Sequence, residues 1–203
     1  MMKTALSPVL RRAKTSAFPT ANNATRSITI GTDMLSTVIS LQKARPWSMS
    51  PKKASNMAVD NAVTLKDLFA DKLVGVFGVP APFTGTCSNE HYPGYQKLAA
   101  QLREAGIHEI VCVAVSDPYA HYAWHQALAN NPEEITFLAD TDATFARAYG
   151  VDTLLDECSL GLRNKRFSMI VTDGTVSTFR LVEDAAGDAE AMLADLKEIN
   201  ENQ

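Results

Sequence analysis

The sequence predicts an α/β fold in which a mixed sheet is covered by helices on both faces. Two uninterrupted apolar runs, at residues 74–79 and 110–115, have the length and composition of strands that are buried on both sides. A segment with helically spaced apolar residues separates them, as in a β-α-β unit. Near the C-terminus, Asp173 and Gly174 lie between two further apolar runs, which indicates a β-hairpin.

The elements of the β-α-β unit have recognisable boundaries. Thr64 is a suitable N-cap for a short helix over residues 65–70, and the first buried strand follows it. A turn rich in proline, glycine and threonine at residues 80–86 leads into a helix over residues 88–105, which Gly106 ends. The second buried strand then completes the unit.

Helices and strands continue to alternate downstream of this unit. The expected elements cover residues 119–130 (helix), 135–138 (strand), 144–149 (helical turn), 167–171 and 175–181 (the hairpin strands) and 188–200 (amphipathic helix). This order corresponds to a thioredoxin-like three-layer α/β fold with a mixed sheet flanked by helices on both faces. Other three-layer α/β folds share the same order.

Composition restricts the class of protein. The chain has 203 residues, of which 46% are hydrophobic and 21% charged, and this is enough apolar material for one ordinary core. A disordered, collagen-like or disulfide-scaffold protein is therefore excluded. No apolar stretch approaches about 18 residues, so we expect no membrane insertion. Three cysteines indicate buried thiols or redox chemistry in a reducing compartment.

Charge is distributed unevenly along the chain. Residues 1–53 hold nine basic residues and one acidic residue, which leaves ten basic and 22 acidic residues for the remainder. The basic segment lacks the dense Lys/Arg blocks and interleaved aromatics of a nucleic-acid arm, so we expect no nucleic-acid partner. It is rich in Arg, Ser and Thr, which is typical of an organellar presequence.

The sequence therefore predicts two regions. Residues 1–50 would form a disordered basic targeting presequence and linker, and residues 51–203 the folded domain. A basic amphipathic helix beginning at Pro8 favours a mitochondrial matrix address, with a plastid address as the alternative. A tail without any address is the simpler alternative.

Cys87 is the residue best placed for chemistry. It lies where the turn after the first buried strand meets the start of a helix, and there the free N–H groups and the helix dipole favour a thiolate over a thiol. The hydroxyl of Thr84 can hydrogen-bond that sulfur or a bound oxygen substrate. Pro80 and Pro82 stiffen the turn. A lone cysteine is otherwise most often an inert buried thiol.

The string VPAPFTGTCSNEHYPGY at residues 79–95 resembles the active-site signature of the peroxiredoxins. It is most similar to the type II, or atypical two-cysteine, branch, in its plant-like organellar form. The similarity extends through IVCVAVSDP at residues 110–118, Trp124 and KRFSM at residues 165–169, and it covers residues 64–199. The animal-type late resolving cysteine has no counterpart, because residues 182–203 contain no cysteine.

This resemblance implies a thiol-dependent peroxidase without a cofactor that reduces hydrogen peroxide and small organic hydroperoxides. Cys87 would be the peroxidatic cysteine, Thr84 the substrate-positioning threonine, Pro80 the shielding proline, and Arg166 the arginine that stabilises the thiolate and the peroxide. The sulfenic acid on Cys87 would be recycled by glutaredoxin and glutathione or by thioredoxin. The family also implies a homodimer.

Several residues near these positions leave alternatives open. Arg166 suits the role because a guanidinium stays charged and offers several donors, but Arg163 and Lys165 are close neighbours in the sequence. Without the resemblance, Arg166 reads as a surface arginine. His91 follows Cys87 by four residues and would either tune the site or be a buried histidine with a satisfied partner.

The other two cysteines have no settled role. Cys112 lies in the second buried strand, where the plant-like pattern has its resolving cysteine, and the alternative is a structural thiol. A disulfide with Cys87 would require the helix start to unfold locally. Cys158 lies in an expected loop and could be a resolving cysteine, a glutathionylation site or neither.

Rival functions have weaker support. A disulfide oxidoreductase would need a Cys-x-x-Cys motif, and Ser, Asn and Glu follow Cys87. A cysteine hydrolase would need a histidine beside the sulfur. A redox sensor or chaperone that does not turn over remains the main alternative. His121 and His125 could bind zinc, but without a third ligand a solvated helix face is the preferred interpretation, so no metal site is predicted.

Overall fold

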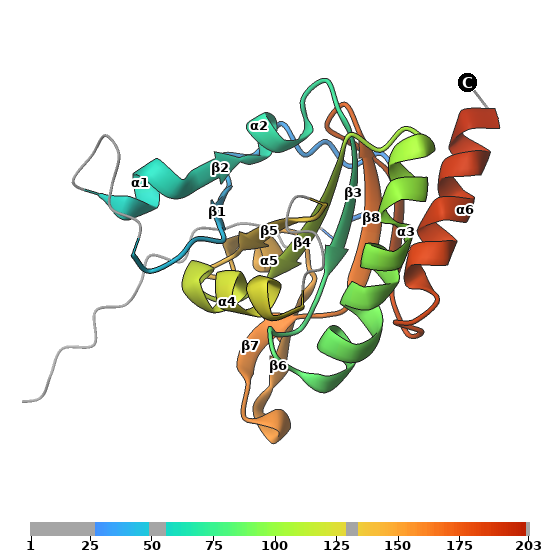
Figure 1. Cartoon of the computed structure of the whole chain (residues 1–203). Helices are drawn as coiled ribbons and strands as arrows, with labels where there is room; N and C mark the ends of the chain where they lie inside the picture. The colour runs from blue at the N-terminus through green and yellow to red at the C-terminus, as the bar shows by residue number, and fades with distance from the viewer. Residues whose placement is uncertain (1–26, 49–55, 129–133, 202–203) are drawn as a thin grey trace, which may run out of the picture.

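The computed structural model describes residues 27–48, 56–128 and 134–201 (Figure 1). The strands are β1 (Ser40–Lys43), β2 (Ala62–Thr64), β3 (Leu73–Gly78), β4 (Glu109–Ala114), β5 (Thr136–Ala139), β6 (Asp152–Leu155), β7 (Gly161–Asn164), β8 (Phe167–Thr172) and β9 (Thr175–Leu181). The helices are α1 (Met57–Asn61), α2 (Leu65–Phe69), η1 (Cys87–His91), α3 (Tyr92–Glu104), α4 (Pro118–Leu128), α5 (Thr144–Ala148), η2 (Asp156–Cys158) and α6 (Asp188–Glu201).

Seven strands form one mixed sheet in the order β2-β1-β5-β4-β3-β8-β9. The three central strands β3, β4 and β5 run parallel, while β1, β2, β8 and β9 pair antiparallel to their neighbours. The β3-α3-β4 connection is the β-α-β unit that the apolar runs predict. The predicted α/β class with a mixed sheet is therefore confirmed.

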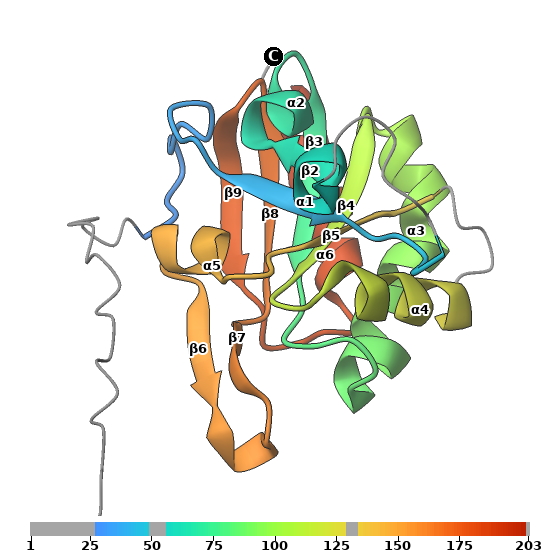
Figure 2. The ribbon, with the colours of Figure 1, turned by 90° about the vertical axis from the view of Figure 1, so that its left-hand side faces the viewer.

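Helices cover both faces of the sheet. On one face, α3, α4 and α6 pack over side chains such as Phe77 and Cys112. On the other face, α2 and α5 pack over Val74, Val76 and Val111. Figure 2 looks onto the α2 and α5 face, with α6 behind the sheet. Because β3 and β4 are buried on both sides, their sequences are apolar at every position.

Local signals behave as the sequence predicts. Thr64 caps α2 in a capping box with Asp67, each side chain bonding the other residue's backbone N–H. Asp173 and Gly174 have φ angles of 43° and 75°, so both central residues of the β8–β9 turn are left-handed. This is the geometry of a type I′ hairpin turn, which glycine and aspartate tolerate well.

The folded domain begins earlier than the sequence predicts. β1 lies inside the large sheet, and Ile28, Met34 and Leu41 are buried in the core beneath it. The boundary at residue 51 is therefore wrong for residues 28–45, because Ile28, Met34, Ile39 and Leu41 pack in the core although the segment as a whole is basic. Of the predicted presequence and linker, residues 1–26 lie outside the described residues.

A second, two-stranded sheet was not predicted. β6 and β7 pair antiparallel from Asp152 and Asn164 to Leu155 and Gly161. The hairpin extends away from the main sheet (Figure 1), and η2 at its tip carries the exposed Cys158. Its residues alternate weakly between polar and apolar, which is why the pattern gives no clear strand signal. In the described ranges, no helix has the length and apolar character needed to cross a membrane.

His121 and His125 do not form the solvated helix face that their spacing suggests. His121 is fully buried and the ring of His125 stacks on Phe137, with centroids 4.3 Å apart. Burial, reinforced by the neighbouring His125, lowers the pKa of His121 to about 3, and burial also lowers the pKa of His125. Both rings are therefore neutral core residues at neutral pH.

These buried histidines predict an acid-sensitive fold. Between pH 6.5 and 5, His121 is protonated in the unfolded state but stays neutral in the folded state, because its folded-state pKa is about 3. The free energy of unfolding therefore falls as the pH is lowered across this window. His121 alone is expected to lower the free energy of unfolding by roughly 2 kcal/mol over that interval. Urea titrations at both pH values measure this change. The His121→Gln variant should show a smaller difference, and an equal difference in the two proteins would refute the assignment.

Candidate active site

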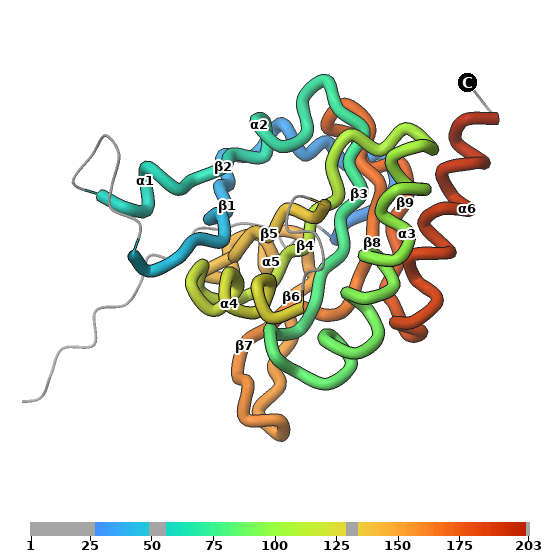
Figure 3. The backbone as a smooth tube through the Cα atoms, in the orientation of Figure 1, coloured from blue at the N-terminus to red at the C-terminus, as the bar shows by residue number. Residues whose placement is uncertain are grey.

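Cys87 lies in the first turn of the helix that follows β3. Phe83, with a φ of 59°, reverses the chain after the two prolines, and the backbone N–H of Ser88 donates to the carbonyl of Thr84 over 3.0 Å. Cys87 then opens η1, a π-helical turn that leads directly into α3 (Figure 3). The residue is only 1% exposed. Wide turns of this kind occur often at functional sites.

Arg166 contacts the sulfur of Cys87 from the segment that joins β7 to β8. It lies between β7 and β8, and the pairing of Gly78 with Phe167 brings this junction beside the end of β3. The Nη2 group of Arg166 donates to Sγ of Cys87 over 3.5 Å. A permanent cation therefore contacts a sulfur that is almost excluded from water.

The neighbouring basic residues point elsewhere. Arg163 donates from Nη1 to the carbonyls of Val115 and Leu162, over 3.0 and 3.3 Å. Lys165 donates from Nζ to the carbonyl of Gly150 over 3.1 Å. Of the three basic residues that the sequence leaves in competition, Arg166 is the one that contacts Cys87.

Thr84 and Pro80 flank the same turn. The Thr84 hydroxyl donates to the carbonyl of Ala81 over 2.8 Å, and so its proton is not directed at the sulfur, which was one of the two expected partners beside a bound oxygen substrate. With its proton engaged, the oxygen offers lone pairs as acceptors on the half-buried side of the turn. Pro80 is half-buried directly after Val79, whose N–H makes the last bond to β4 through Val113.

His91 belongs to a buried network that the sequence did not reveal in full. Its Nδ1 lies 3.1 Å from Nη1 of Arg166, and its Nε2 lies 2.9 Å from Oδ2 of Asp188. Asp188 also accepts from the hydroxyls of Tyr95 and Ser168, over 2.6 and 2.7 Å. The position of His91 four residues after Cys87 was a usable signal. Asp188, 101 positions after Cys87, had none.

The network determines the charge of both groups. Burial by itself raises the pKa of Asp188, but the hydrogen bonds from His91, Tyr95 and Ser168 outweigh it and hold that pKa below its ordinary value. Burial lowers the pKa of His91, and the bond to Asp188 opposes this only in part. Asp188 is thus an anion and His91 a neutral ring at neutral pH.

Cys112 occupies the interior of the sheet. It is fully buried in β4, opposite Phe77 on β3 and Phe137 on β5, and its Sγ lies 4.0 Å from Nε2 of His121. Burial raises the pKa of the Cys112 thiol well above its usual range, and the nearby Cys87 adds to the shift. Cys112 is therefore a protonated thiol near the site, whereas Cys158 is exposed at the tip of the β6–β7 hairpin.

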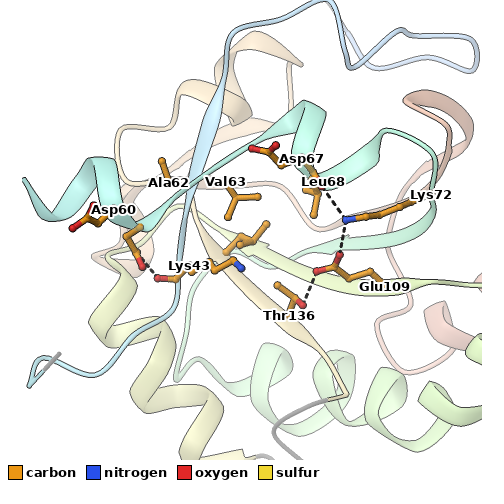
Figure 4. Close-up of a pocket in the computed structure, with 11 residues that line it drawn as sticks. Lys43, Asp60, Ala62, Val63, Asp67, Leu68, Lys72, Glu109 and Thr136 are labelled. Carbon is orange, nitrogen blue, oxygen red and sulfur yellow. Dashed lines mark hydrogen bonds and ion pairs between the residues drawn. The ribbon is translucent and has the colours of Figure 1, made fainter. Parts of the chain in front are cut away.

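One surface pocket is at the opposite end of the central strands. It has a volume of about 320 Å³ and lies near Lys72 and Glu109, which stand at the N-terminal ends of β3 and β4 (Figure 4). Lys72 pairs with Glu109 over 3.5 Å, and Thr136 donates to the same carboxylate over 2.8 Å. Lys72 and Glu109 are thus engaged with each other, and none of the five predicted site residues lines the pocket.

The arrangement around Cys87 suits nucleophilic chemistry by sulfur. A guanidinium can stabilise both an anionic sulfur and negative charge that develops on a leaving oxygen, and it does so most strongly where water is excluded. Within residues 27–48, 56–128 and 134–201, no three His, Cys, Asp or Glu side chains are grouped as a metal site.

Comparisons with known proteins agree with the predicted family. The Redoxin family model matches residues 49–196. The chain is 35% identical over 171 residues to "Peroxiredoxin-2F, mitochondrial" of Oryza sativa subsp. japonica, with 83% of this chain and 82% of that protein covered. It is 36% identical over 160 residues to the protein of the same name from Arabidopsis thaliana, with 78% and 76% covered.

A solved structure extends the agreement to three dimensions. Reduced Prx3 of Vibrio vulnificus in complex with hydrogen peroxide is 33% identical, with a TM-score of 0.71 over 85% of this chain and 98% of that one. The predicted thioredoxin-like arrangement and the predicted resemblance are both confirmed. The chain belongs to the peroxiredoxins, in their plant-like type II branch, and is a thiol-dependent peroxidase.

Proposed function

We propose that this peroxidase reduces hydrogen peroxide and small organic hydroperoxides with Cys87 as its nucleophile. The observation that carries the proposal is the 3.5 Å contact between Nη2 of Arg166 and Sγ of Cys87. The thiolate attacks one peroxide oxygen, the O–O bond breaks, and the other oxygen leaves as hydroxide or alkoxide and takes up a proton. The products are water or an alcohol and a sulfenic acid on Cys87.

Thr84 and Pro80 complete the proposed site. Since the Thr84 hydroxyl donates to Ala81, its oxygen is free to accept a hydrogen bond from a peroxide O–H and so orient the peroxide for in-line attack. Pro80 has no N–H and stiffens the turn that covers the sulfur. Because Cys87 is only 1% exposed, we expect small hydroperoxides to reach it more readily than bulky ones.

The test of this function is repeated turnover. Purified protein supplied with dithiothreitol, with glutaredoxin and glutathione, or with thioredoxin should consume many equivalents of hydrogen peroxide per Cys87. Consumption of a single equivalent with every reductant would favour the alternative function, a redox sensor or chaperone in which Cys87 oxidises without turnover.

We further propose that an external thiol, delivered by glutaredoxin and glutathione or by thioredoxin, resolves the sulfenic acid. Cys112 is the internal alternative, but its raised pKa keeps it a weak nucleophile, because the thiolate is the attacking form. Its place inside β4 also prevents an approach to Cys87 unless η1 unwinds. The buried sulfur of Cys87 requires a similar local opening for any thiol to reach it.

The Cys112→Ser variant distinguishes the two routes. With glutaredoxin and glutathione as reductant, we expect its turnover to stay within about threefold of the wild type, because the external thiol attacks Cys87 directly. The intact mass of both the wild type and the variant, measured after one equivalent of peroxide and excess glutathione, should show a single glutathione adduct. A loss of two hydrogens that depends on Cys112, or a turnover at least about tenfold lower, would instead make Cys112 the resolving cysteine.

Location and assembly are proposed on the same footing. Residues 1–26 are basic and lack acidic residues, and the relatives named above carry mitochondrial names, while others are named chloroplastic. These names support an organellar location. We propose the mitochondrial matrix, with a plastid as the alternative, and import of the full chain into isolated organelles checks it. A homodimer is the expected assembly, which sedimentation of the purified protein measures.

A further inference from the structure

Four side chains from three separate segments form one continuous chain of contacts at the site. Cys87 opens η1, Arg166 precedes β8, His91 ends η1, and Asp188 begins α6. The contacts between successive members are 3.5, 3.1 and 2.9 Å. His91 and Asp188 are 0% and 2% exposed, so this is an internal arrangement and not a surface ion pair.

The direction of each hydrogen bond follows from the chemistry of the groups. A guanidinium can only donate, so the Nδ1 atom of His91 that faces Arg166 must present its lone pair. The ring is then neutral with its proton on Nε2, and that N–H donates to the carboxylate of Asp188. The Asp188 anion therefore polarises the imidazole, which strengthens the hydrogen bond that Nδ1 of His91 accepts from Nη1 of Arg166.

Three side-chain hydrogen bonds fix the carboxylate of Asp188 in place. Its Oδ1 accepts from Ser168 on β8, and its Oδ2 accepts from Tyr95 on α3 as well as from His91. The ring of Tyr95 itself stacks on Phe77 of β3, with centroids 4.0 Å apart. The carboxylate is thus fixed to the sheet and to two helices, whereas the Arg166 side chain has several rotatable bonds.

We propose that Asp188 is a positioning residue, which acts through the ring of His91 to hold the guanidinium of Arg166 against the sulfur of Cys87. The inference rests on the proposed function of Cys87 and Arg166. With Nη1 occupied by His91, the guanidinium is oriented so that Nη2 faces the sulfur. Without the acceptor on His91, the Arg166 side chain has to be ordered in the transition state, and this lowers the rate of reaction with peroxide.

The inference is tested by a double-mutant cycle on the rate of reaction with hydrogen peroxide. Asp188→Asn keeps an acceptor for the His91 N–H and removes the charge, so we expect kcat/KM for hydrogen peroxide to fall about tenfold. His91→Phe removes the connection, and its fall should be between about tenfold and a hundredfold. In the His91→Phe background, Asp188→Asn should have no further effect beyond about twofold.

Two further variants separate positioning from a loss of structure. Asp140→Asn replaces a buried carboxylate outside this network, one that accepts from the backbone N–H groups of Phe145 and Ala146, and it should lower the melting temperature while it leaves kcat/KM within about twofold. His91→Asn restores an acceptor near the Nδ1 position and should recover part of the rate lost in His91→Phe. If His91→Phe does not fold, the comparison of Asp188→Asn with Asp140→Asn still decides the question.

Clear outcomes would overturn the inference. Asp188→Asn could leave the rate within about twofold of the wild type, or could reduce it equally with and without His91; either result shows that Asp188 does not act through His91. Turnover by the wild-type protein in the same assay tests the proposed function separately. A wild type without turnover would refute that function. An active wild type in which the effects of the Asp188 and His91 substitutions are additive would refute only the positioning role of Asp188.

Discussion

Replacing Cys87 by serine is expected to abolish peroxide turnover, with a fall in kcat/KM of at least about 10⁴-fold. A hydroxyl at this position keeps the shape of the side chain but stays protonated at neutral pH, and it is a far weaker nucleophile toward an O–O bond than a thiolate. The contact of Arg166 can stabilise an anionic sulfur but cannot ionise a serine. Peroxide consumption with dithiothreitol as reductant measures the loss.

The other two cysteines provide the matched controls for this variant. Cys158→Ser alters the exposed thiol at the tip of the β6–β7 hairpin and should retain full activity. Circular dichroism should show that Cys87→Ser is folded, because serine is close in size to the cysteine it replaces. Substantial turnover by folded Cys87→Ser would mean that Cys112 or Cys158 supplies the nucleophile, and the proposed site would have to be abandoned.

Replacing Arg166 by methionine is expected to lower kcat/KM for hydrogen peroxide by about 10² to 10³-fold. Methionine retains much of the apolar stem and removes the cation that contacts the sulfur. Both the ionised form of Cys87 and the charge on the leaving oxygen would lose their donor, in a place that water barely reaches. Steady-state kinetics with varied peroxide measure the effect.

Lys165→Met is the natural control for this substitution. It removes a cation from the adjacent residue, whose Nζ bonds the Gly150 carbonyl and not the site, so kcat/KM should stay within about twofold. Arg166→Lys keeps a positive charge but lacks the fork that contacts both His91 and Cys87, and it should recover little of the rate. If Arg166→Met and Lys165→Met lower kcat/KM equally, the loss comes from the removal of one positive charge and not from the contact of Arg166 with Cys87.

Local sequence signals predicted most of the fold correctly. The apolar runs became β3 and β4, the Asp-Gly pair became the β8–β9 turn, and Thr64 capped α2. Each of these depends on neighbours within a few residues, where propensity and burial act together. The β6–β7 hairpin and the strand β1 were missed, because their short polar segments become strands only when a partner strand is present.

The site was predictable to a different extent for each residue. Cys87 could be singled out from its place at a helix start, and the similarity of the surrounding string supported it. Arg166 depended on the resemblance alone, since a strand arginine has no local mark of function. Asp188 could not be found, because it begins a helix in which an acidic first residue already has an ordinary explanation.

The amino-acid sequence by itself determined the layered α/β class, the parallel unit around β3 and β4, and the sulfur at the helix start, since periodicity and caps encode these within short segments. Only the tertiary structure decided which arginine meets that sulfur, which carboxylate lies behind His91, and that Cys112 is a thiol enclosed by the sheet. The first two facts arise where the end of β3 meets the starts of β8 and α6, and the third arises from the pairing of β4 with β3 and β5. Contacts between distant segments depend on packing geometry, and no local pattern of residues records them.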